Sequence, residues 1–390
     1  MALETSTIAA GLDFELSDSQ KAIQELARNF AEKEMRPTVM KYDESQEFPF
    51  DIVHKLADLG FMGITWPEEL GGAGLSELDA TIIIEELAKV DPSVALTVAS
   101  HNSLCTGHIM LHASKAQKNK FVPDLASGRK LGAWGLTEPG SGSDSGGMKT
   151  TATRDGNDWI LNGSKTFITQ GSVGSTYVIM AVTDRTNPKA SISTFILERG
   201  MKGFSIGKKE NKLGMRCSDT ATLIFESVRV PGENLIGNVG EGFKQALQVL
   251  DGGRVGIAAL SVGIAQGALD ASLKYSKERM QFGKHLADFQ AVQWKLADMA
   301  TEINAARILT QKAAWMKMKG LDINLSAAQA KYLASEVAVR AANEAVQIHG
   351  GYGFIKDFPV EKLYRDVKLM TIGEGTSEVQ KMVIARNLLK

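Results

Sequence analysis

The chain has little cysteine and almost no net charge. Its 390 residues include two cysteines, Cys105 and Cys217, so a small disulfide-built scaffold is excluded. Lys and Arg number 44 against 45 Asp and Glu, and a formal net charge of −1 gives no reason to expect nucleic acid or an anionic membrane as partner. We therefore expect a soluble protein of a reducing compartment, cytoplasmic if bacterial or in the mitochondrial matrix if eukaryotic.

Long apolar runs and targeting signals are also missing. No apolar run in the sequence reaches the length that spans a bilayer. The opening stretch MALETSTIAAGLDFELSD carries acids and no arginine, which argues against a transit peptide, and its apolar part is too short for a signal sequence. A hydrophobic content of 44% and a charged content of 23% describe a globular protein. Because 390 residues exceed one ordinary core, we expect two or three domains.

Residues 1–130 are predicted to form an N-terminal α-helical domain. The stretch LSDSQKAIQELARNFAEKEMRP opens with a capping pair, Ser17 and Gln20, and stops at Pro37. Helix-like stretches follow, such as FDIVHKLADLGF and DATIIIEELAKV. Nothing up to about Ser127 alternates in the manner of a strand.

Residues 131–240 are predicted to form a β-domain. Short β-branched and aromatic segments are separated here by Gly, Asn and Asp, and Asp155-Gly156 is typical of a hairpin turn. The segments are DGNDWILNGSKTFITQG, STYVIMAVTD, ISTFILERG and TATLIFESVRVP. Their spacing indicates a barrel or a sandwich.

Residues 241–390 are predicted to form a C-terminal four-helix bundle. One apolar stripe recurs at alternating steps of four and three, through Val292, Leu296, Met299, Ile303 and Ala306. The predicted fold is thus an α+β multidomain chain in the order helices, β-domain, helices.

The β-domain opens with a stretch rich in glycine and hydroxyl groups, WGLTEPGSGSDSGG, from Trp134 to Gly147. Loops that cradle phosphates often have this composition. The third glycine of a dinucleotide fingerprint is missing, no βαβ unit follows, and the Lys-Ser/Thr of a triphosphate loop is absent. On composition alone, a flexible linker is as plausible as a binding loop.

Four residues could share one helical face as metal ligands: His101, Cys105, His108 and His112. The H-E-x-x-H pattern of zinc proteases is absent, since Ile109 follows His108, and the segment is largely apolar. We expect no metal here, and interpret these side chains as lining a helix interface or a ligand pocket.

Near the C-terminus, IGEGTSEVQ sets Glu374 between two glycines. Glycine leaves room for backbone bending and close approach. Alone, this pattern is typical of a surface loop, and RMQFGKHLADFQ and QIHGGYG are equally unspecific alone.

Together, five motifs in this order resemble the acyl-CoA dehydrogenase family from about Leu16 to Lys390. They are LTEPGSGSD, FITQG, RMQFGKHLADFQ, QIHGGYGF and YRDVKLMTIGEGTSEVQKMVIARNLL. The resemblance implies a flavoprotein oxidoreductase of fatty acid or amino acid degradation. It further implies FAD as cofactor, an acyl-CoA substrate, electron-transferring flavoprotein as electron acceptor, and a homotetramer built as a dimer of dimers.

The resemblance also implies site residues. Phe167 stands where many relatives have Trp. Phenylalanine keeps the flat apolar surface of that side chain but lacks its indole N–H donor. Cofactor contacts, some from a neighbouring subunit, are implied for Trp134, Leu136, Thr137, Gly142, Ser143, Phe167, Ile168, Thr169, Arg279, Phe282, Gln290, Gln347, Gly350, Gly351, Thr376 and Glu378. Substrate contacts are implied for Ser143, Asp251, Arg254, Gly373 and Gly375.

Glu374 stands at the family's catalytic base position. The family's reaction removes a proton from the α-carbon and a hydride from the β-carbon of an acyl thioester. The thioester oxygen is held by the base residue's backbone N–H and a ribityl hydroxyl. Some relatives place their base where this chain has Gly253, so no second candidate competes. Many straight-chain relatives have Tyr where this chain has Gly373, which favours a short, branched or cyclic acyl group.

Two alternatives remain on the sequence. A flavin-dependent oxidase or oxygenase could share the fold, although an oxygenase would need no α-proton base. A non-catalytic acyl-CoA-binding relative could have kept the fold without turnover, although both the base and the flavin motifs are retained.

Overall fold

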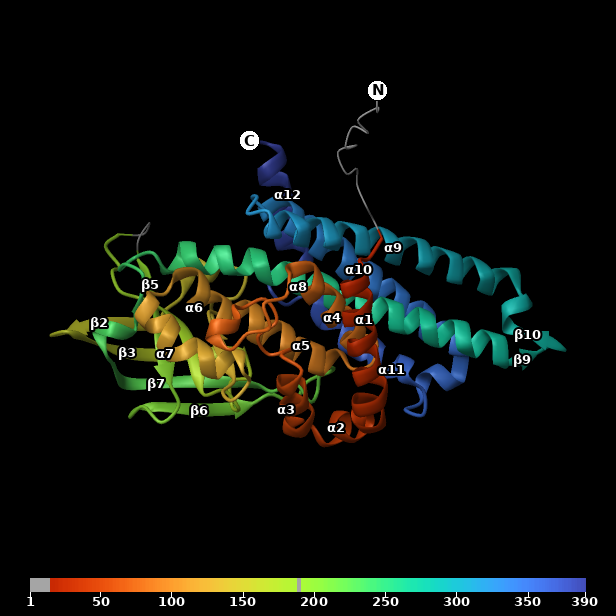
Figure 1. Ribbon diagram of the computed structural model, residues 1–390, viewed down its shortest axis with the longest axis horizontal. Coiled ribbons are helices and arrows are strands. Elements are labelled where there is room, and N and C mark those ends of the chain that lie inside the picture. Colours follow the sequence, from red (N-terminus) through yellow and green to blue (C-terminus); the bar gives the residue numbers. More distant parts are fainter. Residues whose placement is uncertain (1–14, 188–190) are drawn as a thin grey trace, which may run out of the picture.

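The computed structural model describes residues 15–187 and 191–390, arranged as three successive regions (Figure 1). The strands of the middle region gather at one end of the molecule, and the long C-terminal helices extend to the other end, where a small hairpin lies. Helices from the first part of the chain pack against both. The α+β order predicted from the sequence is confirmed.

The N-terminal region is helical. Ser17 and Gln20 form the predicted capping box at the start of the first helix. That helix continues through a π-helical turn, Ala31–Met35, and ends in a 3-10 turn that contains Pro37. The helices are α1 (Asp18–Phe30), α2 (Val39–Ser45), α3 (Phe50–Asp58), α4 (Glu77–Ala88), α5 (Pro92–Ser100), α6 (Gly107–His112) and α7 (Lys115–Ala126). A second π-helical turn, η4 (His101–Thr106), joins α5 to α6.

The middle region is one sheet that folds on itself. Its strands are β1 (Gly132–Gly135), β2 (Thr151–Asp155), β3 (Asp158–Thr169), β4 (Thr176–Val182), β5 (Ile192–Glu198), β6 (Phe204–Lys209), β7 (Thr220–Val230) and β8 (Leu235–Ile236). The order is β6-β7-β3-β2-β4-β5-β8, with β1 parallel to β4. The predicted hairpin is confirmed, since Asp155 pairs with Asp158 across a turn in which Gly156 has φ 60°. Strands β1, β6 and β8 were not identified from the sequence.

Strand β4 is buried on both faces. Tyr177 and Ile179 belong to a core shared with β3, β5 and β7, whereas Val178 and Met180 pack with side chains of α6 and α7. A strand covered on both sides reads as a continuous apolar run, as YVIMAV does. The β-region is therefore fixed to the N-terminal helices.

The C-terminal region is a helical bundle. It contains α8 (Gly242–Glu278), α9 (Gln290–Met318), α10 (Asn324–His349), α11 (Pro359–Asp366) and α12 (Ser377–Leu388). Helix α10 packs against α8, α9 and α12, and α8 also packs against α9. The predicted stripe on α9 faces this core, with Met299, Ile303 and Ala306 buried. A small hairpin of β9 (Met280–Gln281) and β10 (Lys284–His285) follows α8.

Helix α8 corrects one expectation from the sequence. It is long enough to cross a membrane, and its most apolar 18-residue window has a mean hydropathy of 1.3. However, 83% of that window is buried inside the protein. Its apolar character is explained by packing on four other helices, α4, α5, α9 and α10.

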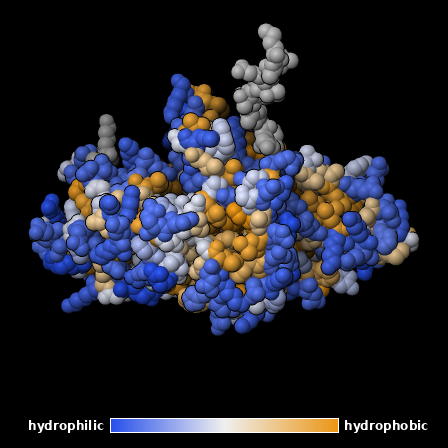
Figure 2. Space-filling model, in the orientation of Figure 1, coloured by the Kyte–Doolittle hydropathy of each residue, from blue (hydrophilic) through white to orange (hydrophobic). Residues whose placement is uncertain are grey.

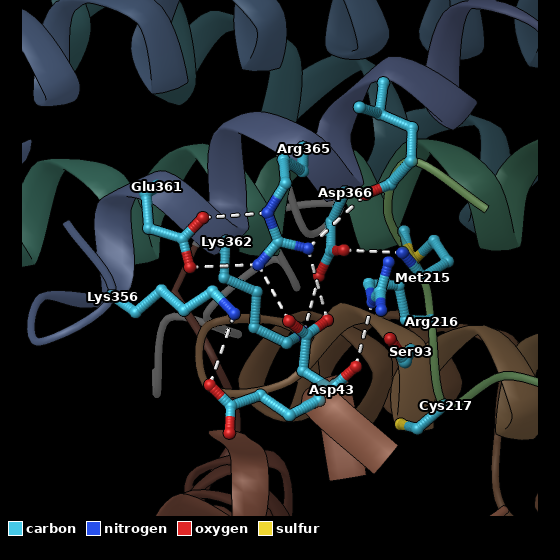
Figure 3. A network of polar contacts seen from close by, with 12 residues as sticks. Asp43, Ser93, Met215, Arg216, Cys217, Lys356, Glu361, Lys362, Arg365 and Asp366 are labelled. Carbon is cyan, nitrogen blue, oxygen red and sulfur yellow. Dashed lines mark hydrogen bonds and ion pairs between the residues drawn. The ribbon is translucent and has the colours of Figure 1, made fainter. Parts of the chain in front are cut away.

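Buried charges join the three regions (Figure 3). Lys362 of α11 is 2% exposed and pairs with Asp366 at 2.6 Å and with Asp91 of the N-terminal region at 2.9 Å. Asp366 also accepts a hydrogen bond from the backbone N–H of Met215, which precedes β7. Burial opposes the charge of Lys362, yet the two carboxylates raise the pKa of its ammonium. The network anchors α11 just before the segment that carries Glu374.

Candidate active site

Glu374 lies in a turn between a 3-10 helix, Val367–Thr371, and α12. Glu374 itself adopts φ 54° and Gly375 φ 95°. A left-handed conformation costs a side-chain-bearing residue roughly 1–3 kcal/mol and needs support from its surroundings. At Gly375 a Cβ would also lie 2.7 Å from Gln380 Nε2, whereas at Gly373 it would meet only ordinary contacts of 3.5 Å or more. The backbone conformation and this close contact therefore require a glycine at position 375, whereas a side chain could be accommodated at position 373.

Three side chains hold this turn. Gln380 Nε2 donates to the carbonyl oxygens of Glu374 and Gly375, at 3.2 and 2.9 Å. Lys331 Nζ of α10 donates to the carbonyl of Gly375 at 2.7 Å. Thr376 Oγ1 accepts from the backbone N–H of Val379 at 3.3 Å and so caps α12. The strained turn is thus fixed by α10 and by its own following helix.

One oxygen of the Glu374 carboxylate, Oε2, is buried and has no hydrogen-bond partner among the residues that the structure describes. Burial raises the pKa of Glu374 to about 7, against the opposing charges of Lys331 and Arg254. A desolvated carboxylate with a pKa near neutrality and a free oxygen can accept a proton from a bound molecule.

Gly253 of α8 faces this carboxylate. A Cβ at Gly253 would lie 2.1 Å from Glu374 Oε2 and 3.3 Å from Leu104 Cδ2. Position 253 and residue 374 therefore converge on one point in space, and a side chain at 253 would displace the carboxylate. This explains in atomic terms why a glycine stands at position 253 in a chain that carries Glu374.

Asp251 and Arg254 lie one turn apart on α8, next to Glu374. They form an ion pair, and Asp251 also accepts hydrogen bonds from Asn324 Nδ2 at 3.0 and 3.2 Å. Asn387 of α12 in turn donates to Asn324 Oδ1 at 2.7 Å. Arg254 is 4% exposed, and its Nε has no partner in the described part of the chain. A buried cation with a free donor can receive an anionic or carbonyl oxygen.

The glycine-rich stretch of the β-region is a fixed loop, which decides against the flexible linker. Its Glu138 side chain accepts from the backbone N–H groups of Lys149 and Thr150, at 2.5 and 2.9 Å. The buried Lys165 Nζ pairs with Glu138 at 2.8 Å and donates to the carbonyl of Leu136 at 3.0 Å. Burial lowers the pKa of Lys165 to about 8, against the charge of Glu138. This pair was not found from the sequence.

Trp134 of β1 is oriented by a histidine. Its Nε1 donates to His108 Nδ1 at 3.0 Å, so the second ring nitrogen of His108 carries the proton and donates to Gln245 Oε1 at 3.2 Å. Burial lowers the pKa of His108 to about 3, so the ring stays neutral. A neutral histidine that makes two hydrogen bonds holds the indole in one position.

A β-bulge exposes Phe167. The pairing of β3 with β7 shifts between Lys165 and Ile168, and Phe167 adopts φ 56° with 64% of its side chain exposed. Its neighbours differ, since Ile168 is buried and Thr169 is half-buried. Bulges often re-aim a side chain beside an active site. Here the bulge places an aromatic ring on the surface. The ring lies near the glycine-rich loop, since the backbone N–H of the neighbouring Thr166 donates to the carbonyl of Thr137 in that loop.

The histidines around η4 do not form a metal site. His101 accepts from the backbone N–H of Gly132 and contacts the carbonyl of Leu125 at 2.9 Å, and His108 is bonded as described. Within residues 15–187 and 191–390, no group of three His, Cys, Asp or Glu side chains could hold a metal ion. His101 and His108 link this segment to α7, α8 and β1.

Glu378, in the first turn of α12, lies near Glu374, whereas another group of predicted residues lies far from it. Arg279 stands over the ring of Tyr352 at 5.2 Å and borders a pocket of about 540 Å³ with Gly350 and Gly351. Phe282, Gln290 and Gln347 are exposed at the same end of the bundle. At about 1.5 Å per residue, roughly 37 Å of α8 separates Arg254 from Arg279. The predicted residues thus form two separate groups within one chain (Figure 1).

Comparison with known proteins identifies the architecture. The N-terminal, middle and C-terminal domain models of the acyl-CoA dehydrogenases match residues 17–129, 133–228 and 240–389. The chain belongs to the acyl-CoA dehydrogenase family. It is an enzyme of this family, a flavoprotein oxidoreductase.

Similar proteins agree over nearly the full length. A short-chain specific acyl-CoA dehydrogenase of Clostridium acetobutylicum is 48% identical over 379 residues, which cover 97% of this chain and 100% of that protein. Butyryl-CoA dehydrogenase from Megasphaera elsdenii has a TM-score of 0.95 and 45% identity, covering 97% and 100% of the two chains. A chain from structural work on the electron-transferring flavoprotein of Acidaminococcus fermentans has a TM-score of 0.96 and 47% identity, with the same coverage.

The cofactor of this family is FAD, and the chain's own residues fit it. An added Cβ at Gly140 or Gly142 would meet no described atom within 4 Å, so this backbone can closely approach a ligand. The exposed ring of Phe167 offers a flat apolar surface beside that loop. The individual FAD and CoA contacts stay predictions.

Proposed function

We propose that this enzyme dehydrogenates short-chain acyl-CoA thioesters to 2-enoyl-CoA, with Glu374 as the catalytic base. One observation carries the proposal: a carboxylate with one buried, unpartnered oxygen, set in a strained turn and facing space that only a glycine at position 253 leaves free. No partner within the described structure competes for that oxygen. Such an atom is available to a substrate proton.

The step itself follows from the charges around Glu374. Oε2 takes the proton from the α-carbon, the C–H bond breaks, and its electron pair moves toward the thioester carbonyl. The positive charges of Arg254 and Lys331 face the site and favour the ionised carboxylate before transfer. The backbone N–H of Glu374, fixed by the held turn, is the expected donor to the thioester oxygen. FAD, when bound, supplies the acceptor for the hydride that leaves the β-carbon.

The relatives and the residue before the base support a short acyl group. Two short-chain specific acyl-CoA dehydrogenases are 48% and 45% identical to this chain. Gly373 carries no side chain beside the carboxylate, which adds width to the site but no depth. Together these features favour short straight, branched or cyclic groups.

An acyl-CoA panel tests this substrate class. Butyryl-CoA, isobutyryl-CoA and a cyclic acyl-CoA should bleach the bound FAD anaerobically. A chain of about twelve carbons should react at least tenfold more slowly, because Gly373 widens the acyl site without deepening it. The measurement is stopped-flow absorbance of the flavin. A clear preference for the twelve-carbon chain would contradict the substrate assignment, and no bleaching by any thioester would contradict the proposed function.

We propose electron-transferring flavoprotein as the acceptor of the electrons. The likeness to a chain studied with such a flavoprotein supports this choice. An oxidase would instead pass the electrons to oxygen.

The two separate groups of predicted cofactor residues support a homotetramer. Large apolar side chains project from the bundle end that carries Arg279, where Phe282 is 93%, Phe354 88% and Trp294 60% exposed. Hydrophobic surface is visible over the middle of the molecule and toward this end (Figure 2). We propose that this end completes the FAD site of a neighbouring copy.

Assembly is tested by light scattering on the FAD-loaded enzyme. A tetramer is expected, and Arg279→Ala should weaken FAD binding by about tenfold or more because a charged partner of a phosphate is lost. A monomer that holds FAD and turns over would contradict the shared site.

A further inference from the structure

Lys331 is a buried cation that the motifs of the sequence do not single out. It lies on α10 with 0% exposure, among the buried alanines Ala327, Ala330 and Ala334. Its ammonium donates to a backbone carbonyl, that of Gly375, at 2.7 Å. Burying an ammonium is costly unless a partner stabilises the charge. Packing alone therefore does not explain a lysine at this position.

The charges that face Lys331 come from several helices. Burial lowers the pKa of Lys331 to about 8, and Glu374 is the leading group that raises it again. Glu336 of the same helix and Glu378 of α12 contribute in the same direction, while Arg254 of α8 opposes them. Conversely, Lys331 comes before Arg254 among the charges that lower the pKa of Glu374. Because Arg254 is already paired with Asp251, Lys331 is the cation left to balance Glu374.

The contact with Gly375 has a geometric consequence. The Gly375 carbonyl follows directly on the left-handed Glu374, and its two donors, Lys331 and Gln380, come from different helices. Gln380 belongs to the helix that the turn itself begins, so it moves with the turn. Among the described residues, Lys331 is the donor that ties this carbonyl to α10, and Ser377 Oγ, two residues on, adds a hydrogen bond to Glu336 of the same helix at 2.6 Å.

Resting on the proposed function, we propose that Lys331 is the positioning residue of the catalytic base: its ammonium anchors the turn that carries Glu374 and is the buried countercharge of that carboxylate. When Glu374 is ionised, the pair is neutral as a whole. When Glu374 takes up the substrate proton, the charge of Lys331 is left unbalanced, which favours later release of that proton. Lys331 itself touches no reacting atom.

The test is the pH dependence of flavin reduction by butyryl-CoA in Lys331→Met, which keeps most of the side-chain length and removes the charge. The rate of flavin reduction should fall at low pH as Glu374 becomes protonated, and this fall is the acid limb of the pH profile. Loss of the countercharge should raise the apparent pKa of the acid limb by about one unit or more, and so slow flavin reduction about tenfold at pH 6–7. The difference from wild type should narrow above pH 8, where Lys331 loses its own proton. A residue needed only for packing would lower the rate equally at every pH.

Two further variants complete the test. Lys331→Gln keeps a donor for the Gly375 carbonyl without charge, so it should show the same shift and serves if Lys331→Met does not retain FAD. Lys295→Met removes an ion pair with Glu344 between α9 and α10, and should leave the acid limb in place. An unshifted acid limb in an active Lys331→Met or Lys331→Gln enzyme overturns the inference. A wild-type enzyme that butyryl-CoA does not reduce would instead overturn the proposed function.

Discussion

Glu374→Gln is expected to slow flavin reduction by about 10²–10⁴-fold while FAD and acyl-CoA still bind. Glutamine keeps the size of the side chain but cannot accept the α-proton. Anaerobic stopped-flow bleaching measures the effect, and Glu378→Gln is the matched control. Glu378 is exposed in the first turn of α12, so its loss should weaken FAD binding more than the chemical step. A near wild-type rate of flavin bleaching in Glu374→Gln would show that Glu374 is not the base.

The same variant should be more stable than the wild type at alkaline pH. The pKa of Glu374 is raised from 4.5 to about 7, so the folded state binds its proton more tightly than the unfolded state does. The stability that this proton contributes is complete below pH 4.5 and is lost as pH rises to about 7. Glu374→Gln should therefore gain up to about 3 kcal/mol above pH 7 and nothing below pH 4.5. Urea unfolding at both pH values checks the sign.

Lys362→Met is expected to reduce the free energy of unfolding by about 3–5 kcal/mol. The substitution leaves Asp91 and Asp366 buried without their cation, at the point where the three regions meet (Figure 3). Urea unfolding followed by circular dichroism provides the measurement.

Lys356→Met is the control for that experiment. Lys356 pairs with Glu44 on the surface of the same network, with 63% and 56% of their side chains exposed. Its loss should cost less than about 1 kcal/mol. Equal effects of the two substitutions would show that the buried network does not hold the regions together.

Features with local causes could be predicted from the sequence. The capping box of Ser17 and Gln20 and the turn at Asp155-Gly156 depend on residues a few positions apart, and both are present in the structure. The stripe on α9 was found because helical periodicity reports which face is buried. Strands β1 and β8 escaped notice because, at four and two residues, they are too short to show alternation.

The support of the site could not be predicted in the same way. Lys165 and Glu138 are 27 residues apart, and Lys331 and Gly375 are 44 apart, so only the folded chain brings them together. One signal was available for Lys331, since it stands in a run of alanines at a position that the helical period places toward the core. No sequence signal was available for the positive φ of Glu374, because glutamate rarely adopts this conformation and tertiary contacts impose it here.

The most direct test of the account isolates proton removal from hydride transfer. A 3-thiaacyl-CoA has sulfur in place of the β-carbon, so it can lose an α-proton but no β-hydride. With this analogue in D₂O, NMR should show rapid exchange of the α-protons by the FAD-loaded wild type and at least about a hundredfold slower exchange by Glu374→Gln. Exchange at the wild-type rate in Glu374→Gln would contradict the claim that Glu374 is the base.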